Sequence, residues 1–249
     1  MDAEQWHEHY RLQGQWLAEG RDFLLRRAGI ANFTAILDFG CATGVISEEI
    51  RRRTGRPLTG IDRDMSLIEL ARKKFPANHF LHGDETTLLK ARLRFDLILI
   101  SFVLMWQPDP IPFLSRMRRL LAKKGRLLVL AEPDYGGRID YPEELTNLKD
   151  IYIDHIQAGN GDPFIGRKLA FLLDEAGFQA ETGVFNQVGQ FPFPGQRRWE
   201  KEWRFWERLT GRDLGYWRKI ERRAIAAKKR FVLFPIFHAD AWVRGPWGR

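Results

Sequence analysis

Residues 35–44, AILDFGCATG, place one acid and two glycines where a strand would end. An apolar run leads into Asp38, Gly40 and Gly44 follow, and a helical pattern begins at Val45. We interpret this as strand, tight turn and helix, the arrangement at which an α/β sheet opens a cofactor crevice. Glycine lets the backbone turn sharply and approach a ligand closely. The free N–H groups at the start of the helix favour a carboxylate or phosphate there.

The spacing within this loop separates two classes of cofactor. A dinucleotide loop reads G-x-G-x-x-G, whereas here Gly40, Ala42 and Gly44 stand at alternate positions behind Asp38. The loop resembles motif I of the class I S-adenosyl-L-methionine (SAM)-dependent methyltransferases, commonly D-x-G-x-G-x-G. The resemblance implies that these four residues and Cys41 bind the cofactor. Ala42 departs from the motif, which costs about 1–2 kcal/mol if the position needs a positive φ and almost nothing if it needs only a small residue.

A second acid, Asp62, ends the next apolar run. It lies about 20 residues beyond the loop, where a carboxylate can accept hydrogen bonds from both ribose hydroxyls. An acid after a strand is more often a helix N-cap, but Asp64 fills that role better, ahead of the helical pattern from Met65. The resemblance implies that Asp62 binds the ribose and that Arg63 and Met65 lie beside the adenine.

A third acid, Asp84, ends another short apolar run. In the family that the chain resembles, the corresponding acid accepts a hydrogen bond from the adenine amino group. The backbone N–H of the next residue, here Glu85, then helps to bind the ring. The alternative is that Asp84 only caps a short helix beginning at Glu85.

The run Phe95–Ser101 is predicted to be the most buried strand, apolar on both faces. It resembles motif IV of small-molecule methyltransferases, which ends near the sulfonium, so Ser101 and Phe102 are expected to contact SAM. The following turn carries Met105 and Trp106 where relatives often have histidines, which excludes an imidazole base at this place. It also lacks the [DN]-P-P-[YF] loop of many enzymes that methylate amide or exocyclic nitrogens, which disfavours that activity.

Residues 1–30 are predicted to form an N-terminal helical cap of one or two helices ending at Gly29. In related methyltransferases a helix before motif I covers the cofactor. Tyr10, Arg11 and Gln13 are then expected to reach the methionine end of SAM. An amphipathic helix with solvated Arg11 and Gln13 fits the pattern equally well.

The sequence offers several weak candidates for a general base, which methyl transfer needs only if the bound acceptor is protonated. They are Tyr10, Asp134, Tyr135, His155 and His238. A glycine pair follows Asp134 and Tyr135, so these two are expected to face a substrate from a mobile loop; a plain turn is the alternative. The segment from Tyr141 to Ala158 is predicted to be a lid helix. No metal site is predicted.

Composition restricts the class of protein. At 249 residues with 44% hydrophobic content, the chain fits one α/β domain with insertions and argues against disorder. A single cysteine, Cys41, rules out an intrachain disulfide and suits a reducing compartment. The polar N-terminus gives no sign of a signal peptide, and no apolar run approaches the ~18 residues of a membrane span. We therefore expect a cytoplasmic location and no membrane partner.

The net charge of +8 belongs to one segment. Residues 196–230 hold 13 basic and 5 acidic residues, which leaves 27 of each elsewhere from totals of 40 and 32. Trp199, Trp203 and Trp206 fall on one helical face there. Core packing of a helical cap beside the substrate pocket is the favoured interpretation. The alternative is a stacking platform and electrostatic footprint for RNA or protein.

Taken in order, the loop, Asp62, Asp84, Ser101 and a glycine-led strand at Gly125 follow the family pattern with strand–helix alternation. The resemblance covers about residues 35–190 and resumes near 231–244. Residues 178–188 are predicted to form the sixth strand, and residues 231–244 the seventh, broken by Pro235. The resemblance implies a Rossmann-like α/β fold: a seven-stranded mixed sheet with its last strand antiparallel and helices on both faces. SAM would lie across the carboxyl ends of strands 1, 2 and 4.

The predicted organisation is one methyltransferase domain over residues 1–249. Its SAM-binding core spans 35–190, a basic, tryptophan-rich helical insertion spans 191–230, and the last strand and tail span 231–249. The predicted function is methyl transfer from SAM to an O, N or C nucleophile of a small molecule, leaving S-adenosylhomocysteine. An RNA or protein methyltransferase and a SAM-binding protein without turnover are alternatives. The tight loop disfavours a nicotinamide dehydrogenase, and the sequence specifies neither the acceptor nor an oligomeric state.

Overall fold

The computed structural model describes residues 1–186 and 196–244 and centres on a mixed sheet. The sheet has seven strands in the order β3-β2-β1-β4-β5-β9-β7. Only β9 runs antiparallel to its neighbours within this sheet, as the sequence predicts. The strands are β1 (Ile36–Phe39), β2 (Thr59–Asp62), β3 (His79–His82), β4 (Phe95–Ser101), β5 (Leu121–Pro133), β7 (Phe178–Asn186) and β9 (Pro235–Val243).

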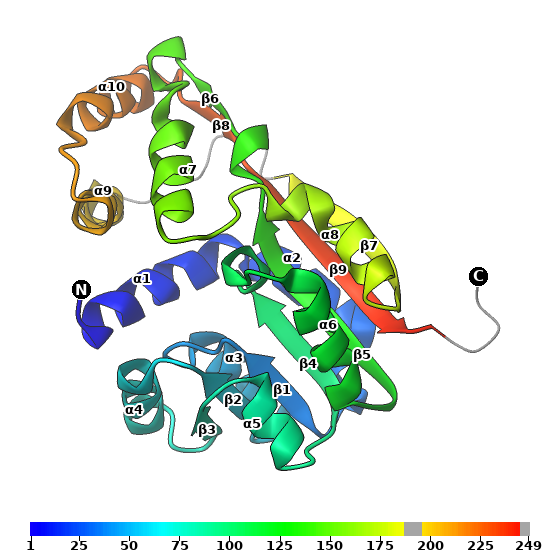
Figure 1. The fold of residues 1–249 in the computed structure, drawn as a ribbon. Helices are drawn as coiled ribbons and strands as arrows, with labels where there is room; N and C mark the ends of the chain where they lie inside the picture. Colours follow the sequence, from blue (N-terminus) through cyan, green and yellow to red (C-terminus); the bar gives the residue numbers. More distant parts are fainter. Residues whose placement is uncertain (187–195, 245–249) are drawn as a thin grey trace.

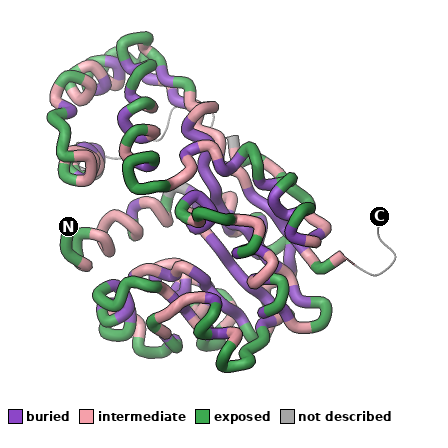
Figure 2. Tube along the Cα trace, in the orientation of Figure 1, coloured by how far each residue is buried: buried purple, intermediate pink, exposed green. Residues whose placement is uncertain are grey.

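Helices cover both faces of the sheet (Figures 1 and 2). Alternate residues of the central strands are buried on opposite faces, in two separate cores. Leu97 and Leu99 of β4 pack with α2 and α3, whereas Ile98 and Ile100 pack with α6 and α8. All four side chains are fully buried, which confirms that β4 is apolar on both faces. The covering helices are α2 (Ala18–Ala28), α3 (Val45–Thr54), α4 (Met65–Lys74), α5 (Glu85–Lys90), α6 (Pro110–Leu120) and α8 (Ile165–Glu175).

A group of helices and a small sheet form a second layer, and α1 (Ala3–Trp16) runs between this layer and the main sheet (Figure 1). The group consists of α7 (Leu148–Ala158), α9 (Gln196–Thr210), α10 (Gly215–Ala226), β6 (Ile139–Tyr141) and β8 (Phe231–Leu233). Short 3₁₀ turns connect the elements: η1 (Ile30–Asn32), η2 (Leu104–Trp106), η3 (Tyr135–Gly137) and η4 (Glu143–Leu145). We call this second layer the cap; it does not include α1 and α2, which form the predicted N-terminal helical segment.

Two predicted elements differ in the structure. The lid helix does not begin at Tyr141: that residue ends β6, and α7 begins only at Leu148. Pro142 explains the change, because the residue before a proline is restricted to extended backbone. The predicted last strand is two strands, since β8 pairs with β6 in the cap and only β9 joins the main sheet.

Strand β5 begins at Leu121, four residues before the predicted start at Gly125; the boundaries that follow agree with the sequence where they are described. The N-terminal segment forms two helices, and α2 ends at Gly29 in a left-handed C-cap. The predicted sixth strand, 178–188, is β7 up to Asn186, and its last two residues lie outside the described ones. The basic insertion is helical over α9 and α10, with residues 191–195 outside the described part.

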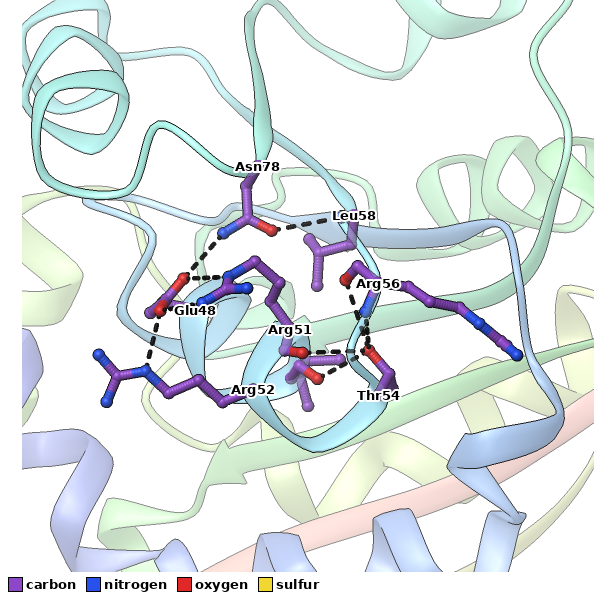
Figure 3. A network of polar contacts seen from close by, with 8 residues as sticks. Glu48, Arg51, Arg52, Thr54, Arg56, Leu58 and Asn78 are labelled. Atoms are coloured by element: carbon purple, nitrogen blue, oxygen red, sulfur yellow. Dashed lines mark hydrogen bonds and ion pairs between the residues drawn. The ribbon is translucent and has the colours of Figure 1, made fainter.

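A polar network fixes α3 (Figure 3). The buried Glu48 carboxylate accepts hydrogen bonds from Arg51 and Arg52, both at 2.8 Å, and from the Asn78 amide at 3.3 Å. Asn78 in turn accepts the backbone N–H of Leu58 at 3.2 Å. The network ties α3, from Glu48 in its first turn, to the segments that lead into β2 and β3, and so fixes the helix that follows the glycine loop.

Candidate active site

A cavity of about 590 Å³ lies between the carboxyl ends of β1, β2 and β4, α1 and the cap. Its volume falls within the ~300–1,000 Å³ of small-molecule and cofactor sites. The cavity brings together most of the residues predicted from the sequence. These are Tyr10, Gln13, Asp38, Gly40, Cys41, Ala42, Asp62, Arg63, Asp84, Ser101, Phe102, Tyr135 and His155.

The loop from β1 to α3 holds three alternate residues in left-handed conformation. The φ angles are +73° for Gly40, +47° for Ala42 and +77° for Gly44. The position of Ala42 therefore needs a positive φ, and alanine is strained there. Two features require glycine at position 40. Its φ is positive, and a Cβ there would meet Val103 Cγ2 at 2.6 Å. The loop can thus approach a ligand with its backbone.

Asp62 connects the end of β2 to this loop. Its Oδ2 accepts the backbone N–H of Ala42 at 2.9 Å, and its Oδ1 accepts that of Asp64 at 3.0 Å. Asp64 caps α4, accepting the N–H groups of Ser66 and Leu67, which confirms the predicted cap. A carboxylate offers about four acceptor positions, so Asp62 keeps capacity for a ligand in the cavity.

Asp38 is the buried acid of the site. Its carboxylate accepts a hydrogen bond from the Ser47 hydroxyl at 2.5 Å. Burial raises the pKa of Asp38 to about 6, and the negative charge of Asp62 adds to the rise. Arg21, also buried, donates to the Gly14 carbonyl at 2.8 Å and pairs with Glu49, which fixes the junction of α1 and α2 beside the loop.

Asp84 lines the cavity and also caps α5. Its Oδ1 accepts the N–H groups of Thr86 and Thr87, both at 3.0 Å, and the Thr86 hydroxyl at 2.6 Å. The hydroxyl bond from Thr86 is the largest cause that lowers the pKa of Asp84. Asp84 therefore does cap α5, but these bonds all reach Oδ1, and among the described residues Oδ2 has no hydrogen-bond partner.

Four predicted cofactor residues lie outside the lining of the cavity; one is Gly44, the N-cap of α3. Glu85 is buried and pairs with Arg116 at 2.7 Å, and Met65 is 44% exposed at the start of α4. Arg11 points away from the cavity, where it pairs with Glu8 at 3.1 Å. The prediction that Arg11 reaches the methionine end is wrong in this structure, because that part of α1 turns its polar face to solvent.

The turn after β4 is held by an acid that the sequence analysis missed. Glu132, fully buried at the end of β5, accepts the backbone N–H groups of Val103 and Leu104 at 2.9 Å and of Met105 at 3.3 Å. Burial raises the pKa of Glu132 to about 7 although these three bonds oppose the rise. The signal available in the sequence was an acid directly after the apolar run Leu127–Ala131. Glu132 positions the turn behind Ser101.

On α1, His9 lines the cavity beside Tyr10 and Gln13, and the sequence analysis missed it. Its ring stacks on Phe205 with centroids 3.6 Å apart, and burial lowers its pKa to about 4, so the imidazole is neutral near pH 7. Burial raises the pKa of Tyr10. Residues 9, 13 and 17 are spaced by four and all line the cavity. This helical spacing was the signal in the sequence for the face of α1 that points into the cavity.

The weak candidates for a general base divide into two groups. Tyr10, Tyr135 and His155 line the cavity, whereas Asp134 and His238 do not. Asp134 is buried and forms two bonds with Arg167, at 2.6 and 2.7 Å. His238 is buried on β9 with its ring 4.3 Å from that of Phe185. The latter two are therefore structural residues.

The tryptophan stripe of α9 is part of the core. Trp199 and Trp203 are buried, and both donate their indole N–H to Glu221 at 2.8 Å. Glu221 also accepts the Nε of Arg230 at 2.8 Å. The core-packing interpretation is correct, and a base-stacking platform on these two rings is excluded. Trp206, at the edge of the stripe, lines the cavity.

The sheet order and the glycine loop define the fold of the class I SAM-dependent methyltransferases. The model of the methyltransferase domain family matches residues 7–182, so the chain belongs to this family. Among curated relatives, a demethylmenaquinone methyltransferase of Thermotoga maritima is 29% identical over 49% of this chain and 56% of its own length. A trans-aconitate 2-methyltransferase of Rhizobium leguminosarum is 28% identical over 51% of this chain and 52% of its own. The chain spans about half the length of these relatives.

Solved structures agree on the fold. A SAM-dependent methyltransferase from Archaeoglobus fulgidus has a TM-score of 0.54 at 18% identity, over 93% of this chain and 98% of its own. The YcgJ protein of Bacillus subtilis has a TM-score of 0.57 at 13% identity, over 92% of this chain and 100% of its own. These findings confirm the predicted fold class and family, and SAM as the family's cofactor.

Proposed function

We propose that this protein is an enzyme that transfers the methyl group of SAM to a small-molecule acceptor. The observation that carries the proposal is the hydrogen bond from the backbone N–H of Ala42 to the Asp62 carboxylate. It joins the acid expected to bind the ribose to the glycine loop, at one wall of the cavity. Relatives named for demethylmenaquinone, trans-aconitate and malonyl-[acyl-carrier protein] support a small acceptor group. The single buried, free cysteine supports a cytoplasmic location.

The residues of the cavity fit the cofactor. The loop around Gly40 leaves no room for a Cβ and offers backbone instead. Asp62 would accept the ribose hydroxyls, and Asp84, through Oδ2, would accept the adenine amino group. Ser101 and Phe102 would lie at the methionine end, with Tyr10 covering it from α1.

The chain's own residues then position and shield the acceptor. SAM supplies a methyl group already activated on a sulfonium, so that the new bond forms in line as the C–S bond breaks and sulfur keeps the electron pair. Holding two reactants in line can contribute ~7–11 kcal/mol. Trp106, Phe205 and Trp206 line the cavity and exclude water from it. Neutral His9 can accept a hydrogen bond from an acceptor N–H or O–H.

Ion pairs within the protein weaken the alternative that the substrate is RNA. Several basic side chains of α9 and α10 are paired within the protein: Lys201 with Glu8, Arg212 with Asp154, and Arg218 with Glu207. These pairs reduce the charge available for phosphates. An acceptor bound in the cavity is therefore the better supported substrate.

Calorimetric titration with SAM, S-adenosylhomocysteine and NAD tests the proposal. We expect micromolar binding of the first two, loss of at least tenfold in affinity in Asp62→Asn and Asp62→Ala, and no change in Asp154→Ala, an exposed aspartate of α7. Binding of NAD alone, or of neither class of cofactor by the folded protein, would refute the proposal.

A further inference from the structure

A second cavity of about 150 Å³ adjoins the first. The two share part of their walls, including Gln13, Phe102 and Tyr135. Phe102 directly follows the residue that ends β4, so the second cavity opens where the methionine end of the cofactor is expected. A dry cavity of about this volume binds benzene in another protein. The space therefore suits a single ring beside the cofactor.

The walls of the second cavity are aromatic. Tyr135 lies with its ring centroid 5.7 Å from that of Tyr152 and 4.7 Å from that of Phe234. The ring of Tyr152 lies 4.3 Å from that of Trp206. Trp199 and Trp203 complete the lining from α9. Faces and edges of aromatic side chains at these spacings favour a flat aromatic ligand.

The charged side chains that line the second cavity are two basic and two acidic residues. Arg138 and Arg230 line it, and so do Glu202 and Glu221. Asp140 lies outside the lining, where it accepts from Arg138 at 2.7 Å and from Arg230 at 2.5 Å. Glu221 is also engaged, by Arg230 and two indole N–H groups. Because Arg138, Arg230 and Glu221 already form ion pairs within the protein, a charged ligand would compete with these pairs and would lose its hydration, so an uncharged one fits better.

Hydrogen-bond donors are available at one end. Within residues 1–186 and 196–244, the structure gives no hydrogen-bond partner to the hydroxyl of Tyr135 or of Tyr152. Arg138 binds Asp140 through Nε and Nη2, which leaves the Nη1 protons without a partner in that same part. The guanidinium carbon of Arg138 lies 5.0 Å from the centre of the Tyr152 ring, and the Tyr135 and Tyr152 rings are 5.7 Å apart, so the three donors lie near one another. Their common complement is an oxygen acceptor.

We propose that the methyl acceptor is an uncharged, single-ring aromatic compound with an oxygen substituent, of the phenol class. Its ring lies among the aromatic walls, and its oxygen accepts hydrogen bonds from Tyr152, Tyr135 and Arg138. That oxygen forms the bond to the methyl carbon as the C–S bond breaks, and its proton passes to the neutral imidazole of His9, which lines both cavities. This inference rests on the proposed function, since it takes the second cavity as the acceptor end of the same site.

Binding of three probes to the protein saturated with S-adenosylhomocysteine tests the inference. At pH 7 phenol is neutral, benzoate is an anion and benzylamine is a cation. We expect phenol to bind at least tenfold more tightly than either charged probe, by titration calorimetry and quenching of tryptophan fluorescence. Tyr152→Phe and Tyr135→Phe should each weaken phenol about 3- to 10-fold, the loss of one hydrogen bond. Tyr216→Phe, an exposed tyrosine of α10, should not change it.

The outcomes separate this inference from the proposed function. If S-adenosylhomocysteine binds and phenol does not, or benzoate or benzylamine binds as tightly as phenol, the inference is wrong and the proposed function stands. Unchanged phenol affinity in both tyrosine variants also overturns it. If the cofactor product itself does not bind, the proposed function fails. Binding of the product by each variant shows that the variant is folded.

Discussion

The carboxylate of Asp62 accepts the backbone N–H of Ala42 at 2.9 Å across 20 positions of sequence. Ala42 lies at a φ of +47°, a conformation that L-residues adopt at a cost. The bond stabilises that conformation and orients the acid at the same time. The glycine loop and the acid at the end of β2 are thus one structural unit, and strain in the first is compensated by the second.

Ala42→Gly is expected to stabilise the protein. Removing a side chain from a left-handed residue relieves about 1–2 kcal/mol, while the freer unfolded chain costs about 0.5–1 kcal/mol. The free energy of unfolding in urea should rise by about 0.5–1 kcal/mol. The control Ala170→Gly, at an exposed position inside α8, should lower it by about 1 kcal/mol. Equal losses in both variants would contradict the strain at Ala42.

Gly40→Ala and Gly55→Ala separate backbone strain from a steric clash. Both glycines have φ near +70°, but only at Gly40 would a Cβ meet Val103, whereas Gly55 has nothing within 4 Å. We expect Gly55→Ala to cost about 1 kcal/mol of unfolding free energy. Gly40→Ala should cost about 1–3 kcal/mol more and abolish SAM binding. Adding Val103→Ala to Gly40→Ala should restore part of the stability; failure to do so would show that the clash is unimportant.

Local signals predicted most of the sheet. Asp62 and Asp64 could be told apart from the sequence because helix caps and strand ends have distinct short-range patterns. The pairing of β6 with β8 could not be predicted from the sequence. Tyr141 and Phe231 lie opposite each other but are 90 positions apart, and each strand is too short to show an alternating pattern. Tertiary packing alone determines that small sheet.

The same distinction holds for the site. The loop and its acids form a local motif, whereas the second cavity depends on a cluster of Arg138, Asp140, Glu221 and Arg230 drawn from both ends of the cap. In the sequence these charges look like a solvated surface. Arg138 and Asp140 are neighbours in the chain, but Arg230 joins Asp140 to Glu221 only when α10 and β6 come together, and no periodic pattern in the sequence indicates that contact.

Trp203→Phe is expected to destabilise the cap. Glu221 would lose one of its two indole donors while remaining buried, which costs about 1–3 kcal/mol for a hydrogen bond to a charged group. Urea unfolding followed by circular dichroism measures the loss. Trp217→Phe, a half-buried tryptophan of α10 packed edge-on against Tyr216, serves as the matched control. If both variants lose the same free energy, the bond to Glu221 contributes nothing measurable.

Glu132 should make the protein less stable as the pH rises from 5 to 7. Burial raises its pKa in the folded state from 4.5 to about 7, so in this range the folded state binds more protons than the unfolded one. Stability then falls with increasing pH, by about 2 kcal/mol between pH 5 and pH 7 from this residue alone. Asp38, with a pKa raised to about 6, acts in the same direction.

Glu132→Gln isolates the contribution of this one carboxyl group. The amide oxygen can still accept from the N–H groups of Val103 and Leu104, but it does not titrate. The variant should therefore lose about 2 kcal/mol less than the wild type between pH 5 and pH 7, measured by urea unfolding at each pH. Glu144→Gln, at an exposed position of η4, should leave the slope unchanged. Parallel pH profiles for wild type and Glu132→Gln would mean that Glu132 is not the buried titrating group, and that the turn after β4 is held by a carboxylate already charged at pH 5.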